Sequence, residues 1–289
     1  MSDLSAAYAF CGAQLRAHDK DRFLSILFSP AEKRPHLYAL HAFSAEITNV
    51  RDKVSEPMPG EIRLQWWMDV VRGERASEAA SNPIAHALTE TMARFSLPAK
   101  ALVDMIDARI FDLYDDPMPT LGDFVGYAGE TSSALMQMSA IILNDGEAPN
   151  TADIAGHGGV ACTMARVLCN LPKHIAHGQL YIPLDMLNAH GVCREDVLAR
   201  ETTPEVRAVL KDFHDAADDH VAAMGRYLDQ IPAKVAPAFL QTALVRHYLA
   251  AHAALSDPLN EVATVPQWRR QWILWRAARN ARKICCGQC

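Results

Sequence analysis

The feature that most constrains this chain is a helical hydrophobic period along nearly its whole length. Within Ala31–Lys53, six positions recur at i, i+3, i+4 and i+7 spacing and therefore share one helix face: Leu37, Leu40, His41, Ser44, Ile47 and Thr48. Similar runs occupy Pro83–Phe95, Ala99–Tyr114, Leu121–Leu143, Ile154–Leu171, Pro204–Gln230 and Pro237–Ala254. Two-residue alternation is scarce, so the sequence predicts an all-α fold.

Helix-breaking segments punctuate this pattern at Glu56–Gly60, Pro117–Pro119 and Asn144–Asn150. Cap-type residues ahead of apolar runs predict helix starts near Ser29 and at Thr120. The chain contains no repeat of fixed period and no low-complexity linker. We therefore expect one all-α domain over residues 1–289.

Composition narrows the functional class. The chain has 289 residues, half of them apolar, and a net charge of −6, which argues against nucleic-acid binding. It contains no run of about twenty apolar residues, as a membrane-spanning helix requires. The N-terminal residues lack a secretory pattern, and seven cysteines in such a chain favour reduced thiols. We expect a cytoplasmic location.

Several small residues and cysteines have structural interpretations. Gly156–Gly159 lacks the phosphate-loop pattern and is expected to start a helix or to give it room for close packing. Cys162 and Cys169 lie seven residues apart, on one helix face, and are expected to be core thiols. The cysteines of the tail Cys285–Cys289 are expected to be reduced.

A basic, tryptophan-bearing segment near the C-terminus predicts a helix at about residues 266–284. Trp268, Trp272 and Trp275 recur at i, i+4 and i+7, and the segment carries six basic residues and no acid: Arg269, Arg270, Arg276, Arg279, Arg282 and Lys283. Such a helix can lie on an anionic membrane surface, here the inner face of the membrane. The alternative is a last core helix with its tryptophans packed inward.

Two segments matter most for function. Leu37–Asn49 reads LYALHAFSAEITN and holds Glu46 as its only acid. Ala165–Pro183 reads ARVLCNLPKHIAHGQLYIP and holds none; Lys173, His174 and His177 stand there instead. Pro172 predicts a break in the helix of the second segment.

These segments, with PAEKRPHLYAL, IRLQWW, the passage Asp112–Tyr127 and GQLYIPLD, resemble the squalene/phytoene synthase family over about residues 22–249. The resemblance implies an all-helical isoprenoid synthase bundle with a central cavity. It also implies prenyl transfer in which Mg²⁺, held by two acid clusters, binds a diphosphate. In this chain the family's acid positions are taken by Ala45, Glu46 and Asn49 in the first cluster, and by Asn170, Lys173 and His174 in the second.

The resemblance supplies the candidate pocket residues: Arg22, Glu46, Asn49, Tyr127, Arg166, Asn170 and His174. Arg22 and Arg166 are suited to an anionic head group. No catalytic residue and no metal site is assigned, and Glu46 and Asp112 are the remaining metal candidates. An acidic stretch, Asp104–Asp116, is either a divalent-ion site or a solvated helix face.

Residues 45–67 and 171–185 further resemble a branch of the family related to a mitochondrial complex I assembly factor, which keeps the fold and loses the aspartate motifs. The first hypothesis is a catalytically weak or inactive protein, with no cofactor assigned, that binds a prenyl diphosphate or other lipid-like ligand or assists assembly of respiratory complex I. The alternative is an active enzyme, with Mg²⁺ as cofactor, that condenses two farnesyl or geranylgeranyl diphosphates.

Overall fold

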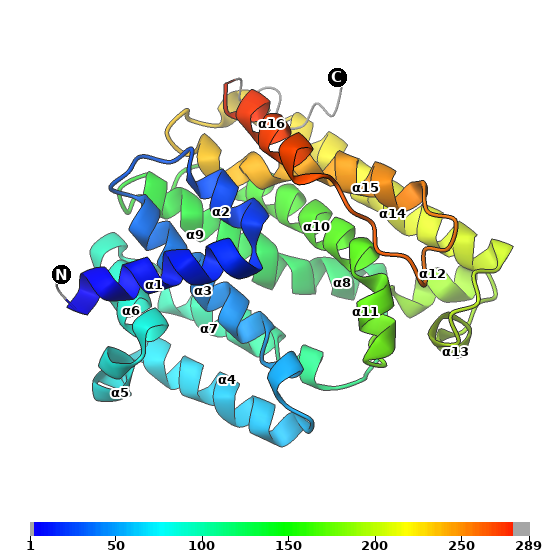
Figure 1. Cartoon of the computed structure of the whole chain (residues 1–289), viewed down its shortest axis with the longest axis horizontal. Coiled ribbons are helices and arrows are strands. Elements are labelled where there is room, and N and C mark those ends of the chain that lie inside the picture. The colour runs from blue at the N-terminus through cyan, green and yellow to red at the C-terminus, as the bar shows by residue number, and fades with distance from the viewer. Residues whose placement is uncertain (1–2, 280–289) are drawn as a thin grey trace. The chain divides into compact units, whose positions relative to one another are not determined.

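The fold is described by a computed structural model that places residues 3–279, and every regular element in that range is a helix (Figure 1). The predicted all-α class is confirmed. The chain divides into two compact units, each described by itself below. The first runs to Tyr114 and includes Ala134–Ala152 and Gln230–Phe239; the second comprises Asp115–Ser133, Asp153–Asp229 and the residues from Leu240 onward. The single-domain organisation stays a prediction.

The first unit is built mainly from N-terminal helices. Its elements are α1 (Asp3–His18), α2 (Lys20–Ile26), α3 (Arg34–Thr48), η1 (Arg51–Lys53), α4 (Pro57–Arg72), α5 (Ala76–Ser81), α6 (Pro83–Phe95), α7 (Ala99–Ala108), η2 (Phe111–Leu113) and α9 (Ala134–Leu143). Helices α1, α3 and α6 pack against one another, and α9 packs on α3 (Figure 1).

Helix α3 is the centre of this unit because one of its faces is buried along most of its length. Of the six residues predicted for that face, all but Thr48 are buried. One of its polar members contacts a neighbouring helix: His41 Nε2 lies 3.1 Å from the Ser139 hydroxyl on α9. The helix start predicted near Ser29 is wrong. A turn at residues 31–33 comes first, and α3 begins at Arg34, with Pro35 in its first turn, where a missing N–H costs no hydrogen bond.

A buried polar cluster joins α1, α3 and α6. The Tyr8 hydroxyl lies 2.9 Å from His36 Nδ1 and 3.2 Å from the Thr91 hydroxyl, and His36 Nδ1 lies 3.0 Å from the same hydroxyl. Burial, with lesser contributions from Arg94 and Lys33, lowers the pKa of His36 to about 4. This imidazole is therefore neutral at physiological pH, as a buried histidine without an anionic partner should be.

The second unit is built around two long helices. Its elements are α8 (Leu121–Ala128), η3 (Gly129–Ser133, a π-helical turn), α10 (Ala152–Cys169), α11 (Leu171–Ala176), α12 (Leu184–Ala189), α13 (Arg194–Leu198), α14 (Pro204–Gly225), η4 (Leu228–Gln230), α15 (Val245–Ala253) and α16 (Gln267–Ala278). The 3₁₀ segment η5 (Ala236–Leu244) contributes residues to both units. Helix α14 packs on α12 and α15.

The predicted start at Thr120 is confirmed. The Thr120 hydroxyl accepts a hydrogen bond from the backbone N–H of Asp123, and the Asp123 side chain accepts one from the Thr120 backbone, so the two form a capping box. The chain that follows does not form one helix to Leu143, as the period predicted, because a π-helical turn interrupts it at Gly129–Ser133.

That π-helical turn faces α10. The Thr163 hydroxyl donates to the Ser132 hydroxyl at 2.7 Å, and the Ser133 hydroxyl donates to the carbonyl of Gly156 at 3.0 Å. A Cβ on Gly159 would overlap the backbone and hydroxyl of Ser133. The glycine-rich segment therefore lies inside α10, where it permits close packing, and does not start the helix.

The C-terminal helix α16 is shorter than predicted and ends at Ala278, with Arg279 as its cap. Residues 280–284 of the predicted helix and the tail cysteines lie outside the described residues. Among the described helices, none is long and apolar enough to cross a membrane.

Candidate ligand site

The first motif segment lies at the C-terminal end of α3. Glu46 is partly exposed there, and Lys53 Nζ donates to its Oε1 at 2.6 Å. Asn49 caps the helix with its backbone N–H, which donates to the carbonyl of Ala45 at 3.0 Å. The single acid left in this motif is therefore already partnered by a cation from the following 3₁₀ turn.

Arg22, the other candidate of the first unit, lies buried in α2. Its Nε lies 3.3 Å from the Asp19 carboxylate, and Asp19 also caps the helix by accepting from the Arg22 backbone N–H at 3.1 Å. The guanidinium thus has a carboxylate partner one turn earlier, at the N-terminus of its own helix.

The second motif segment breaks where Pro172 predicts. Helix α10 ends at Cys169, and α11 begins at Leu171 with the proline in its first turn. The Asn170 side chain donates from Nδ2 to the carbonyl of Arg166 at 2.9 Å. The same carbonyl also accepts the backbone N–H of Asn170 at 3.0 Å, so the side chain adds a second hydrogen bond that a carboxylate could not donate.

Two other predicted residues join one aromatic cluster. The His174 and Tyr181 rings pack edge to face with centroids 4.9 Å apart, and the Tyr127 and Tyr181 rings lie 6.0 Å apart. Sequence analysis missed Tyr181 as a site residue, although it stands in GQLYIPLD, the segment most similar to the family. The turn at Gly178 separates Tyr181 from His174, so no helical period in the sequence predicts the contact between their rings.

The structure thus distributes the seven candidates over both units. Arg22, Glu46 and Asn49 belong to the first unit. In the second unit, Tyr127 and His174 both pack against Tyr181, and Asn170 donates a hydrogen bond to Arg166. The neighbouring thiol of Cys169 is buried, and burial raises its pKa to about 12, so it is a core thiol and not a nucleophile. Cys162 is only half-buried.

Two acids of the stretch Asp104–Asp116 have basic partners. Asp112 is buried and accepts from Arg109 Nη1 at 3.0 Å, while Asp104 pairs with Lys100 at 2.7 Å on the surface of α7. Neither the buried pair nor the surface pair leaves the open set of oxygens that Mg²⁺ prefers.

Magnesium chemistry does not fit the residues present. Within residues 3–279, no group of three or more His, Cys, Asp or Glu side chains is arranged to hold a metal ion. Glu46 is occupied by Lys53, and the second motif contains no carboxylate from Cys162 to Tyr181. The family's mechanism uses carboxylates from both motifs to hold Mg²⁺ around a diphosphate, and the residues present do not supply such a set.

Comparison with known proteins identifies the family of this chain. The squalene/phytoene synthase family model matches residues 15–276. The chain belongs to the squalene/phytoene synthase family. The predicted family is confirmed, and so is the predicted branch. Human NADH dehydrogenase (ubiquinone) complex I, assembly factor 6 is 30% identical over 240 residues, which cover 83% of this chain and 72% of the relative.

Family members that are named as enzymes are also similar to this chain. The phytoene synthase of Thermus thermophilus is 26% identical over 277 residues, 93% of this chain and 91% of the relative. A dehydrosqualene synthase structure superposes with a TM-score of 0.78 at 15% identity, covering 96% of each chain. Squalene synthase HpnC from Alicyclobacillus acidocaldarius gives 0.69 at 20% identity, covering 97% and 96%. These two structures confirm the isoprenoid synthase-type fold.

Proposed function

We propose that this chain is a non-catalytic member of the squalene/phytoene synthase family that serves as an assembly factor for respiratory complex I and binds a lipid or isoprenoid. The observation that carries the proposal is the set of contacts that side chains at the motif positions make. Glu46 pairs with Lys53, Asn170 caps α10 and His174 packs on Tyr181. Each residue has a structural partner in place of a metal ion.

The comparisons support the same direction. The relatives named complex I assembly factor 6 in human and cow are 30% and 31% identical, against 26% for the Thermus phytoene synthase.

Catalysis is tested directly by incubating the purified chain with farnesyl or geranylgeranyl diphosphate and Mg²⁺ and measuring pyrophosphate release. The Thermus phytoene synthase is the positive control. We expect no release above the protein-free background. Turnover that disappears in Glu46→Ala would instead establish the active head-to-head prenyl transferase.

The assembly role has a separate test. In a strain lacking this chain, we expect reduced NADH:ubiquinone oxidoreductase activity and reduced assembled complex I. Both should return with the wild-type chain and equally with Glu46→Ala, because the proposed role needs no metal. Normal complex I in the deletion strain would refute the assembly role while leaving the catalytic test unaffected.

Peripheral membrane attachment forms part of the proposal. In α16 the residues Ile273, Leu274 and Ala277 are buried, whereas Trp268, Trp272 and Trp275 are 70%, 44% and 47% exposed. The alternative with inward-packed tryptophans is therefore wrong, since the aliphatic residues fill that side. Exposed indoles beside arginines suit an anionic headgroup layer, where each basic residue gives about 1 kcal/mol at best.

A further inference from the structure

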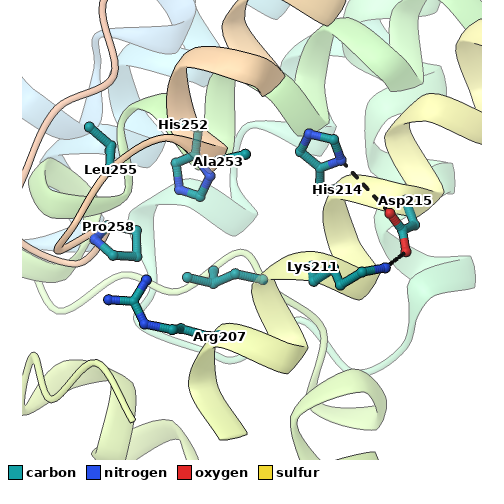
Figure 2. Close-up of a pocket in the computed structure, with 9 residues that line it drawn as sticks. Arg207, Lys211, His214, Asp215, His252, Ala253, Leu255 and Pro258 are labelled. Carbon is teal, nitrogen blue, oxygen red and sulfur yellow. Dashed lines mark hydrogen bonds and ion pairs between the residues drawn. The ribbon is translucent and has the colours of Figure 1, made fainter. Parts of the chain in front are cut away.

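The second unit contains a cavity that none of the motif residues lines. It has a volume of about 360 Å³ and lies between α14 and the end of α15 with the segment that follows (Figure 2). The volume falls within the roughly 300–1,000 Å³ typical of small-molecule pockets. Its lining residues are Arg207, Leu210, Lys211, His214, Asp215, His252, Ala253, Leu255 and Pro258.

The five lining residues of α14 follow a helical period, so a single helix face forms one wall. Leu210 supplies its apolar part, and Ala253, Leu255 and Pro258 supply the opposite wall. Most of the surface is therefore aliphatic, and the polar groups gather at Arg207, Lys211 and the two histidines.

A buried imidazole in this cavity lacks a hydrogen-bond partner. His252 is only 5% exposed, and its Nε2 is buried with no hydrogen-bond partner among the described residues. The Nε2 of His214 is in the same condition. Leaving a buried polar group unsatisfied costs about 1–3 kcal/mol, so a ligand that bonds to Nε2 recovers this cost on binding.

The charges around the cavity restrict the ligand further. Arg207 donates one N–H to the carbonyl of Ser256 and has four others. Lys211 is already paired with Asp215 (Figure 2). His214 Nδ1 lies 3.9 Å from Asp215 and 4.0 Å from Asp218. Arg207 also interacts electrostatically with Asp257, and Asp215 lines the cavity, so the site suits a single negative charge and disfavours a dianion.

We propose that this cavity binds an amphiphilic carboxylic acid, with its carboxylate on Arg207 and His252 and its alkyl chain against Leu210, Leu255 and Pro258. The carboxylate accepts from the guanidinium and from the Nε2–H tautomer of His252, so the buried nitrogen gains a partner. The apolar body replaces water on the aliphatic walls. The inference is independent of the proposed function, because it uses none of the motif residues.

Calorimetric titration of the full chain with decanoate below its micellar concentration tests the proposal. We expect saturable binding at one site. Decanol and decyl phosphate should each bind at least about tenfold more weakly, the first for want of a charged hydrogen bond and the second because of its second charge. Equal binding of decanol, or tighter binding of decyl phosphate, overturns the carboxylate assignment.

Variants test where the ligand binds. Arg207→Gln and His252→Leu should each weaken decanoate binding at least about tenfold. Lys100→Gln is the control, because it also replaces a cation by glutamine but lies on α7, and Lys100 does not line the cavity. In the wild-type chain, the His252 imidazole resonances should move on titration while those of His36 stay fixed. Binding that leaves His252 unmoved overturns the site, whether or not the variants fold.

Discussion

At the scale of single residues, Gly159 shows how closely α10 approaches the π-helical turn. The backbone and hydroxyl of Ser133 occupy the space that a side chain at this position would need. Gly156, three residues earlier in the same helix, has open space in that direction. The two glycines therefore have opposite requirements, although the sequence presents them as one segment.

Gly159→Ala should lower the free energy of unfolding by about 1–3 kcal/mol, because the added methyl group forces backbone to move. Gly156→Ala is the matched control and should raise it by about 0.5–1 kcal/mol, since alanine loses less conformational entropy in a helix. Urea titrations followed by circular dichroism measure both. A neutral Gly159→Ala would show that the approach of Ser133 to α10 is not close.

At the scale of elements, the helical hydrophobic period predicted helix bounds correctly where packing and helix propensity favour the same segment. The predicted run Pro83–Phe95 coincides with α6, and Asn82 caps it by accepting from two backbone N–H groups. The run Ala99–Tyr114 is wrong beyond Ala108, where η2 replaces the α-helix. The π-helical turn and the 3₁₀ segment η5 had no period to predict them, because tertiary contacts such as Thr163–Ser132 select these geometries.

Helix α16 carries the membrane prediction. The pair Trp272→Ala and Trp275→Ala should reduce co-sedimentation with vesicles containing anionic lipid at least about tenfold, as the loss of two interfacial indoles implies. A chain ending at Pro266 should lose binding altogether. High salt and purely zwitterionic vesicles should both weaken the wild-type interaction, because its electrostatic part is screened or absent.

The matched control for α16 is the pair Met58→Ala and Ile62→Ala. These side chains are 71% and 65% exposed on α4, so the control removes comparable apolar surface from a helix without arginine-stacked indoles. Arg276 and Arg279 lie 4.6 and 4.8 Å from the ring centroids of Trp272 and Trp275. Equal loss of binding in both pairs would point to general stickiness and contradict the assignment to α16.

At the scale of the whole molecule, His36 in the first unit and His252 in the second both have a pKa lowered to about 4. In His36 the causes are burial and then nearby cations; in His252 they are burial and then His214. The unfolded chain binds these protons at a pKa of about 6.5, so the stabilisation is complete above that pH and is lost as pH falls toward 4.

Between pH 7.5 and pH 5, each of the two histidines should therefore remove about 2 kcal/mol from the free energy of unfolding. His252→Leu should remove its own share of this pH dependence, while His220 and His247, whose pKa values burial also lowers, retain theirs. Urea titrations at the two pH values measure the effect. A wild-type stability that is flat over this window would contradict the burial of neutral imidazoles.

Magnesium should also leave the stability of the whole chain unchanged. Addition of Mg²⁺ with inorganic pyrophosphate should not raise the melting temperature, and EDTA should not lower it, because a ligand stabilises only a fold that binds it. The Thermus phytoene synthase serves as the positive control. A concentration-dependent rise in this chain would show that carboxylates outside the two motifs hold the metal.

The family and the fold class were accessible from the sequence because motif segments and helical period survive substitution. The contacts of the candidate pocket residues were less accessible from the sequence. The resemblance predicted Glu46, Asn170 and His174 as motif positions. Their contacts with Lys53, Arg166 and Tyr181 depend on how the helices end, which the sequence does not show. The cavity at His252 was invisible, since a lone histidine in an apolar run usually belongs to the core.

The hydrogen bond from the Asn170 amide to the Arg166 carbonyl also limits how a metal-binding motif could be engineered into this chain. An aspartate at this position would lose the donor and place negative charge at the C-terminal, electronegative end of α10, so Asn170→Asp alone should destabilise the helix by roughly 1 kcal/mol or more. An engineered acid here would therefore need a second substitution that offsets its charge at the end of the helix.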